Sequence, residues 1–345
     1  MFIKSVSVFV HRFLLSLAVM LLVSVLLPLQ ARESFVTTAQ MNTTLLNTID
    51  VSAAQGNVGI GVLDLNTGKS WFRNGKQRFP MQSVYKVPIA IAVLKRVDEG
   101  KLGLNQSVTV TRQDFAPGWS PMAQEFKGNS QKFTVQDLLE RSVGISDNTA
   151  ADVLVRLVGG TGQVNAILSR LKIRDVRVDR LERQLQSDCV GLTKFRPELA
   201  DEKKWSEAVQ KIPDSVKKSA IEKYLTDPRD TATPEGIIDL LVKLQSNQLL
   251  SKKSTALLLK IMTDSPTGAK RLKAGLPNNW SIAHKTGSGP DVLGIGTATN
   301  DVGVISSSNG KRVAIAVFIA GSKAPVEARE KVMSDVASAV VKAVE

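Results

Sequence analysis

Residues 281–320 read SIAHKTGSGPDVLGIGTATNDVGVISSSNGKRVAIAVFIA, and their pattern decides the fold. Small apolar and β-branched residues recur in runs that glycine, proline and asparagine separate, which favours a strand for each run. The expected strands lie around residues 281–286, 294–305 and 311–320. A helical pattern begins at residue 326 and continues to the end of the chain.

The opposite end of the chain contributes to the same sheet. Residues 59–63 read as a strand, and 71–72 read as the returning strand after a turn. Elsewhere the apolar periodicity is helical. The expected helices cover residues 35–54, 83–97, 135–142, 149–158, 162–171, 235–246 and 252–263. The pattern predicts an α/β chain whose two ends close one sheet, with a helical part inserted between them.

The composition is that of a globular protein with few metal-binding side chains. The 345 residues are 43% apolar and 22% charged, which allows a sizeable core and excludes wholesale disorder. Cys189 is the only cysteine, so no internal disulfide can form, and we expect a buried spectator. The two histidines are His11 and His284, too few for a multi-histidine metal site. We expect His284 to be a packed strand residue.

Residues 1–31 have the features of a secretory signal peptide. Basic residues precede an apolar run from Phe13 to Leu29, and the small residue Ala31 suits cleavage. A permanent membrane anchor is the alternative, but Pro28 interrupts the helix that would have to span the bilayer. No cysteine lies near the cut, so a lipid anchor is not expected. The expected location is the periplasm or the medium, without stable membrane insertion after signal removal.

The net charge of +13 raises the question of nucleic-acid binding. Lysine and arginine are spread along the whole sequence and interleaved with acidic residues, as at 180–183 and 201–204. Nucleic-acid binders concentrate their charge on one arm or face. We therefore expect a small anionic molecule as the partner, and no nucleic acid.

Three short motifs carry the chemistry. Ser83-Val84-Tyr85-Lys86 places a serine and a lysine on one face of a helix start, where the lysine can serve as the base for a serine nucleophile. Ser146-Asp147-Asn148 lies on a loop that opens the next helix. Lys285-Thr286-Gly287 lies on a strand, with a glycine where a ligand must approach the backbone. Each motif alone is common by chance, but all three in this order are specific.

With these motifs the sequence resembles the penicillin-recognising serine enzymes, and specifically the class A β-lactamases. The resemblance covers essentially the whole mature chain. It implies hydrolysis of the β-lactam ring of penicillins and cephalosporins, a small-molecule substrate, by a monomer that needs no cofactor or metal. It also implies an α/β fold of two subdomains with the active site between them. The expected parts are an antiparallel sheet flanked by helices (32–76 and 275–345) and an all-helical subdomain (77–274) that includes an omega loop (178–231).

A glutamate on the omega loop separates the hydrolases of this family from its peptidases. Residues 180–186 match the family pattern R-x-E-x-x-L-N, with Glu182 as its glutamate, except that Gln186 replaces the asparagine. Glu198 follows Arg196-Pro197 and imitates the motif, but it lacks the leucine at the right offset, so Glu182 is preferred. Downstream, Asp230 is expected to pair with Arg180.

The resemblance implies how the acyl-enzyme forms and is hydrolysed. Ser83 attacks the lactam carbonyl, and the oxyanion lies between the backbone N–H groups of Ser83 and Ser288. Lys86 is a candidate acylation base, or a relay for Glu182 acting through water, and the sequence leaves both open. Glu182 activates the water that hydrolyses the acyl-enzyme, and Gln186 is a second holder of that water.

The other two motifs are expected to handle the leaving group and the substrate. Ser146 passes a proton to the departing lactam nitrogen. Lys285 holds Ser146 and the substrate carboxylate electrostatically, while Thr286 donates a hydrogen bond and Gly287 lets the substrate approach. Asn148 positions the side-chain amide of the substrate.

Two more residues complete the expected substrate site. Many relatives place an arginine just after the Lys-Thr-Gly strand, but residues 288–294 contain none. Arg271 matches a subgroup that supplies this arginine from upstream, which suggests the extended-spectrum branch; the alternative is an ordinary surface base. Trp119 fits the family's aromatic gate at the mouth of the site, although a lone tryptophan is usually part of a core.

Two other functions stay open. A D,D-peptidase would share Ser83, Lys86, Ser146 and Lys285 but would not need Glu182. A β-lactam sensor would be acylated and stall, but sensors normally carry membrane spans or partner domains. The glutamate favours the hydrolase.

The omega loop is far longer than is usual in this family, with an insertion at 187–226. Apolar residues recur at helical spacing on both sides of Pro213, which predicts two short amphipathic helices. The ends of the insertion are tied to Glu182 and Asp230, so we expect it to cover or widen the mouth of the site. A surface elaboration remote from catalysis is the alternative.

Overall fold

The computed structural model describes residues 41–345, so the expected signal peptide lies outside the described residues. Its main sheet is antiparallel and has the strand order β2-β1-β10-β9-β7, with β8 paired to β9. The strands are β1 (Asn57–Asp64), β2 (Ser70–Arg73), β7 (Trp280–Ser288), β8 (Asp291–Val292), β9 (Ile295–Ser307) and β10 (Arg312–Ser322). Because β1 pairs with β10, the prediction that both ends of the chain close one sheet is confirmed.

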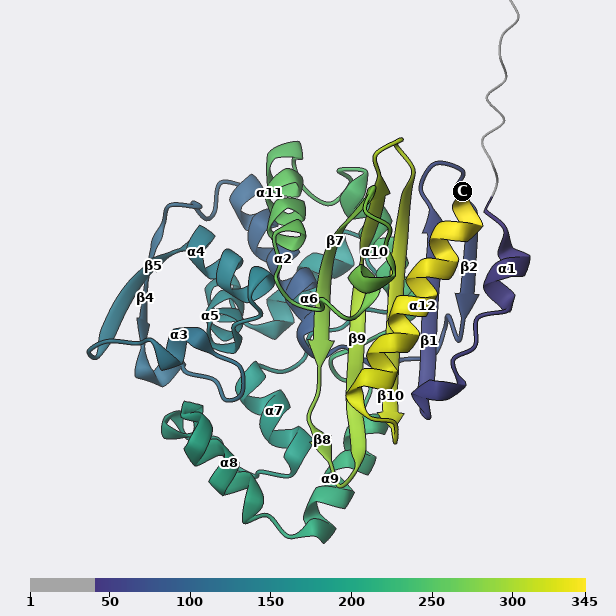
Figure 1. The fold of residues 1–345 in the computed structure, drawn as a ribbon. Helices are drawn as coiled ribbons and strands as arrows, with labels where there is room; N and C mark the ends of the chain where they lie inside the picture. Colours follow the sequence, from purple (N-terminus) through teal and green to yellow (C-terminus); the bar gives the residue numbers. More distant parts are fainter. Residues whose placement is uncertain (1–40) are drawn as a thin grey trace, which may run out of the picture. The chain divides into compact units, whose positions relative to one another are not determined.

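The central strand β10 is buried on both faces, which explains why its sequence is a continuous apolar run. Val313, Ile315, Val317 and Ile319 belong to one buried cluster, together with residues of α12 (Val326–Val344). Ala314, Ala316, Phe318 and Ala320 belong to another, together with residues of α10 (Pro234–Gln245). Successive side chains of a strand point to opposite faces, so both faces of this sheet are covered by helices. Figure 1 shows α12 lying across one of these faces.

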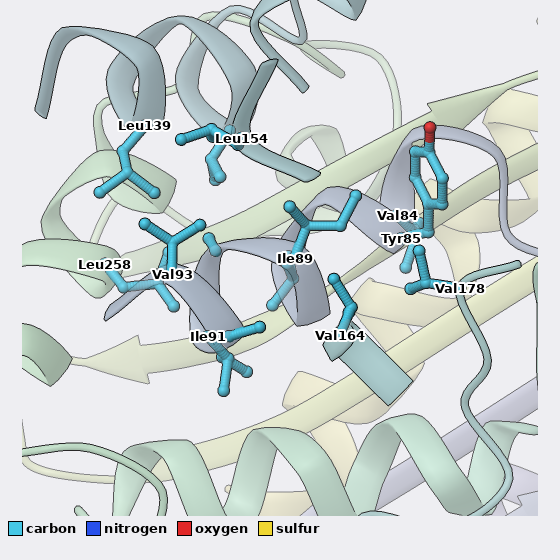
Figure 2. Close-up of a cluster of buried hydrophobic side chains, with 14 of the residues drawn as sticks. Val84, Tyr85, Ile89, Ile91, Val93, Leu139, Leu154, Val164, Val178 and Leu258 are labelled. Atoms are coloured by element: carbon cyan, nitrogen blue, oxygen red, sulfur yellow. The ribbon is translucent and has the colours of Figure 1, made fainter. Parts of the chain in front are cut away.

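The other helices surround α2 (Lys86–Asp98), which is buried from Lys86 through Leu94. Ile89, Ile91 and Val93 of α2 lie among apolar side chains of several neighbouring segments (Figure 2). These neighbours include α4 (Val135–Leu139), α5 (Asn148–Val158), α6 (Thr161–Arg170) and α11 (Lys252–Thr263). A helix buried on nearly all sides is a fixed core element. The turn that enters it is therefore held firmly in place.

The predicted insertion helices are present. They are α8 (Glu202–Gln210) and α9 (Asp214–Thr226), and they follow α7 (Glu182–Val190). Val190, Ile221 and Val292 form a small buried cluster, against which Trp205, Val209 and Ile212 pack. The insertion is therefore attached to both α7 and β8, next to which it lies in Figure 1.

Some predicted elements differ from the structure. The helix expected over 35–54 is wrong in its described part, which holds only α1 (Thr43–Asn47) and a 3₁₀ turn (Ser52–Ala54). Polar side chains compete with a continued helix there: the Thr48 hydroxyl donates to the Leu45 carbonyl at 2.7 Å at the end of α1, and the Asp50 carboxylate accepts from the Ser52 backbone N–H at 2.8 Å. The sequence analysis did not predict α3 (Pro121–Gln124), α7, or the pairs β3 (Phe79–Pro80) with β6 (Thr231–Ala232) and β4 (Ser107–Thr111) with β5 (Ser130–Thr134).

The described residues belong to one unit, Ala39–Glu345, and the division into a sheet subdomain and a helical subdomain stays a prediction. No helix within residues 41–345 is long and apolar enough to cross a membrane.

Candidate active site

The nucleophile candidate lies on a 3₁₀ turn, η2 (Gln82–Tyr85), that leads directly into α2. Lys86 Nζ lies 3.0 Å from Ser83 Oγ and 3.0 Å from Glu182 Oε1. The same ammonium donates to Asn148 Oδ1 at 2.6 Å and to the Ser146 carbonyl at 2.8 Å. Lys86 and Glu182 are fully buried, whereas Ser83 is half-buried. Lys86 and Glu182 therefore meet behind an accessible serine.

Ser146 links the two lysines of the site. Its hydroxyl lies 2.9 Å from Lys285 Nζ and 3.4 Å from Lys86 Nζ. Its backbone is left-handed, with φ at +64°, which turns its carbonyl toward Lys86. The next residue, Asp147, caps α5 by accepting from the Ala150 backbone N–H at 2.9 Å. Its role is to hold the loop.

The strand β7 carries the third motif. Lys285 is fully buried, and burial together with the charge of Lys86 holds its pKa well below the ordinary value. The glycine at 287 meets the chain itself, because a Cβ there would lie 2.4 Å from the Met81 carbonyl oxygen. A glycine was expected here because a ligand must approach the backbone; the structure gives another reason for it. It lets β7 pack directly against the turn that carries Ser83.

Glu182 is the first residue of α7, and a buried carboxylate binds the backbone at this helix start. Asp152 accepts from the Glu182 backbone N–H at 2.6 Å and pairs with Arg183 at 3.2 Å. Burial, together with the negative charge of Glu182, raises the pKa of Asp152 to about 7. The rival Glu198 lies on another 3₁₀ turn (Pro197–Ala200), where its half-exposed side chain pairs with Arg196 at 3.1 Å.

The predicted pair of Arg180 and Asp230 joins the two ends of the segment 178–231. Arg180 Nε lies 2.6 Å from Asp230 Oδ2, and Asp230 Oδ1 accepts from the backbone N–H groups of Asp179 and Arg180. Burial opposes the charge on Arg180, but Asp230 and Asp188 raise the pKa of the guanidinium. A buried, multiply bonded pair of this kind fixes the loop that carries Glu182.

A cavity of about 440 Å³ opens beside these groups. All three motifs contribute to its lining, together with Gln186 and Trp205. The lining residues are Ser83, Gly118, Trp119, Ser146, Asn148, Gln186, Trp205, Thr267, Gly268, Arg271, Thr286, Ser288, Gly289 and Pro290. Arg271 is buried beside it and donates to Ser288 Oγ at 2.7 Å and to the Asn300 carbonyl at 2.9 Å. Trp119 is 60% exposed at the mouth, and its indole N–H bonds the Ile145 carbonyl at 2.7 Å. A volume of this size suits a small molecule.

Gln186 sits between Glu182 and the turn of the nucleophile. Its Nε2 lies 2.9 Å from Glu182 Oε2 and 3.0 Å from Gln82 Oε1. The sequence analysis did not single out Gln82, nor did it place Trp205 in the site. Nothing in their local sequence marks them, because both reach the site through contacts between distant segments.

Two residues are where the sequence analysis expected them, away from the reaction. His284 is buried on β7 and its Nδ1 lies 2.8 Å from Asp301 Oδ1. Cys189 is buried, and burial raises the pKa of its thiol to about 12, which makes it unreactive.

The arrangement suits acyl transfer. An accessible serine hydroxyl contacts a buried lysine, the lysine contacts a buried carboxylate, and an arginine borders the same cavity. Within residues 41–345 no group of three or more histidine, cysteine or acidic side chains is arranged to hold a metal ion.

Comparisons with known proteins agree with this chemistry. Residues 40–344 match the model of a family described as the β-lactamase enzyme family. β-Lactamase VEB-1 of Pseudomonas aeruginosa is 36% identical over 83% of this chain and 85% of its own length. The extended-spectrum β-lactamase PER-1 of the same organism is 31% identical over 83% of this chain and 82% of its own.

Solved structures are similar along most of the chain. A β-lactamase from Chitinophaga pinensis superposes with a TM-score of 0.72 at 30% identity and covers 88% of this chain and 98% of its own. The TLA-1 extended-spectrum β-lactamase also superposes with a TM-score of 0.72, at 29% identity, and covers 88% of this chain and 97% of its own.

Proposed function

The chain belongs to the β-lactamase enzyme family, and from this premise we propose which of its residues open the β-lactam ring and which release the product. As a class A β-lactamase it hydrolyses the β-lactam ring and so confers antibiotic resistance. One observation carries the residue assignment: Lys86 Nζ lies 3.0 Å from both Ser83 Oγ and Glu182 Oε1.

In the acylation step, Ser83 Oγ attacks the lactam carbonyl and loses its proton through Lys86. Every near neighbour of Lys86 Nζ can accept a hydrogen bond, and Glu182 is close enough to take a proton from it. A charged lysine can take the serine proton only after it passes one of its own to Glu182. We therefore assign Lys86 and Glu182 to this step as a pair.

The tetrahedral oxyanion would lie between the backbone N–H groups of Ser83 and Ser288. When the C–N bond of the ring breaks, Ser146 gives its proton to the lactam nitrogen and is reprotonated by a lysine. Lys86 Nζ lies 3.4 Å from the Ser146 hydroxyl and can pass on the proton that it took from Ser83, after which it recovers its own proton from Glu182 and leaves that carboxylate ionised for the next step. Lys285, 2.9 Å from the same hydroxyl, orients it. Ser146 can therefore deliver a proton without accumulating charge.

In the deacylation step, Glu182 takes a proton from a water, which attacks the ester carbonyl. As the bond to Ser83 Oγ breaks, Ser83 regains a proton from Lys86, which recovers one from Glu182, and the opened product leaves. Gln186 holds the Oε2 side of the carboxylate, while Lys86 holds the Oε1 side. This second step is what distinguishes the hydrolase from a D,D-peptidase or a stalled sensor.

The substrate side of the assignment rests on charge and shape. Arg271, Lys285 and Thr286 would hold the substrate carboxylate. Asn148 would meet the side-chain amide, and Trp119 would border the side chain at the mouth. PER-1 and TLA-1 are described as extended-spectrum enzymes, and we propose that this chain likewise accepts bulky cephalosporins.

We further propose that the enzyme works as a monomer in the periplasm or the medium, after removal of residues 1–31. This rests on the apolar run that precedes Ala31. N-terminal sequencing of the exported protein and its mass in solution test both points: a start other than Arg32, or a stable dimer, would contradict them.

The central test compares the wild-type chain with Ser83→Ala, using a chromogenic cephalosporin. We expect many turnovers by the wild type, and neither turnover nor added mass on the variant, with an unchanged melting temperature. Turnover by the variant within tenfold of the wild type would refute the nucleophile. A single persistent adduct on the wild type would indicate a sensor, and release of D-alanine from a peptidoglycan peptide a peptidase.

A further inference from the structure

A row of hydrogen bonds joins the omega-loop insertion to Glu182. Gln82 Nε2 donates to the Tyr224 hydroxyl oxygen at 2.6 Å. Gln186 Nε2 lies 3.0 Å from Gln82 Oε1 and 2.9 Å from Glu182 Oε2. Tyr224 belongs to α9, whereas Gln82 is the residue before the nucleophile. The row therefore runs from the insertion to the base, past the turn that holds Ser83.

The direction of every bond in the row follows from the charge on Glu182. A carboxylate only accepts hydrogen bonds, so Gln186 must present its amide nitrogen to it. The same nitrogen faces Gln82, which must therefore present its oxygen. The amide nitrogen of Gln82 therefore points away from Gln186 and donates to the Tyr224 hydroxyl oxygen.

Gln82 has little freedom to do anything else. It is 1% exposed and its backbone φ is +46°, a left-handed conformation that non-glycine residues seldom adopt. Its Nε2 lies 3.7 Å from Cys189 Sγ, and a Cβ added to Gly289 would lie 3.3 Å from it. Tyr224 is itself 4% exposed. A buried amide nitrogen needs acceptors, and of the two beside Gln82 Nε2 the Tyr224 oxygen at 2.6 Å is the closer and the stronger, so it does most to fix Gln82.

We propose that Tyr224 is a positioning residue for deacylation, which sets the Oε2 side of Glu182 through Gln82 and Gln186. The proposal rests on the proposed function of Glu182. It also accounts for the departure at position 186. Glutamine is one methylene longer than the asparagine of the family pattern, and here its nitrogen bridges Glu182 and Gln82.

The two steps of the reaction should respond differently. Acylation uses the Oε1 side of Glu182, which contacts Lys86 and lies outside the row. Deacylation needs the carboxylate and its water in one fixed position, and the row acts on the side that Gln186 holds. Loss of the Tyr224 oxygen is therefore expected to slow deacylation and spare acylation.

The experiment measures the acylation and deacylation rate constants separately, by stopped-flow with a chromogenic cephalosporin, in the full chain. Tyr224→Phe removes one oxygen atom, and we expect deacylation to slow about 3- to 10-fold, the effect of one neutral buried hydrogen bond. Acylation should stay within twofold. Thr226→Val is the matched control, because its hydroxyl bonds only carbonyls of its own helix, those of Glu222 and Lys223 at 3.1 Å. We expect both rate constants of that variant to equal the wild-type values.

A double-mutant cycle with Gln186→Asn separates positioning from packing. The shorter side chain cannot bridge to Gln82, so Tyr224→Phe should have no further effect on deacylation in that background. Equal slowing in both backgrounds, or an unchanged deacylation rate in the single variant, overturns the proposal. A wild-type chain that never deacylates would instead refute the function of Glu182, before the variants are compared.

Discussion

Replacing Glu182 by glutamine should turn the enzyme into one that accepts a β-lactam and does not release it. Glu182→Gln keeps the size of the side chain and removes its charge and basicity. The Lys86 ammonium, fully buried, then loses the carboxylate 3.0 Å away. An unpaired buried ammonium tends to lose its proton, and a neutral Lys86 can take the proton of Ser83 directly. Acylation therefore continues, but no carboxylate remains to take a proton from the water that hydrolyses the acyl-enzyme.

The expected size of the effect follows from the two roles of Glu182. General-base assistance contributes about 10²- to 10⁴-fold, so deacylation should slow by that factor, or about 3–5 kcal/mol in the barrier. Breaking a buried ion pair costs about 3–5 kcal/mol of folding stability at most. The hydrogen bonds from Lys86 to Asn148 and Ser146 remain, so we expect a smaller loss and a folded variant.

The assay is intact-protein mass after mixing with a chromogenic cephalosporin, with the release of colour followed in parallel. We expect a burst of one equivalent and added mass on Ser83 that persists for minutes or longer. Glu198→Gln is the matched control, since its half-exposed carboxylate pairs only with Arg196, and it should behave as the wild type. Multiple turnovers by Glu182→Gln within tenfold of the wild-type rate, or a trapped adduct on Glu198→Gln instead, would refute the reasoning.

Three other expectations can be measured directly. Arg271→Ala should raise KM several-fold, a loss of about 1–3 kcal/mol of charge-assisted hydrogen bonding, and an unchanged KM for substrates that bear the carboxylate would assign that role to another base. Trp205→Ala should lower kcat/KM for a bulky oxyimino cephalosporin by about fivefold and leave a small penicillin nearly unaffected, since an aromatic contact contributes about 1 kcal/mol; equal factors for both substrates would remove Trp205 from the substrate site. Burial and the charge of Glu182 raise the pKa of Asp152 from 3.8 to about 7, so its contribution to stability is complete below pH 4 and is lost as the pH rises through 7. The free energy of unfolding, measured with urea between pH 5 and 8, should therefore depend less on pH for Asp152→Asn than for the wild type, by up to about 1.4 kcal/mol per pH unit. Equal slopes for the two proteins would contradict this expectation.

The sequence predicted the elements whose pattern is local. The runs at 281–320 predicted β7, β9 and β10, and helical periodicity predicted α10, α11, α12 and the two insertion helices. The short pairs β3–β6 and β4–β5 were missed, because strands of two to five residues carry little periodicity and pair across long separations. The helix α7 was hidden in a polar stretch, where its first turn is capped by Asp152 from another segment.

The motif residues of the site could be predicted for a similar reason, since each motif is contiguous. The structure brings Ser83, Lys86 and Glu182 into contact, as the resemblance implied. Gln82 and Tyr224 could not be found in this way. They lie 142 residues apart in the sequence, and their contact exists only after the insertion has folded onto the turn of the nucleophile.

The glycine at 287 has a consequence for how this enzyme can change. Because no side chain separates β7 from the Met81 carbonyl, the strand and the turn of Ser83 pack directly together, and the two N–H groups proposed to bind the oxyanion belong to them. These two segments cannot be moved apart to admit a larger antibiotic without losing the chemistry. On the side of the insertion the cavity is lined by Gln186 and by Trp205 of α8, and Trp205 packs against a small apolar cluster that includes Ile221 of α9. Selection by new antibiotics should therefore accumulate substitutions in the insertion and leave the β7 side untouched.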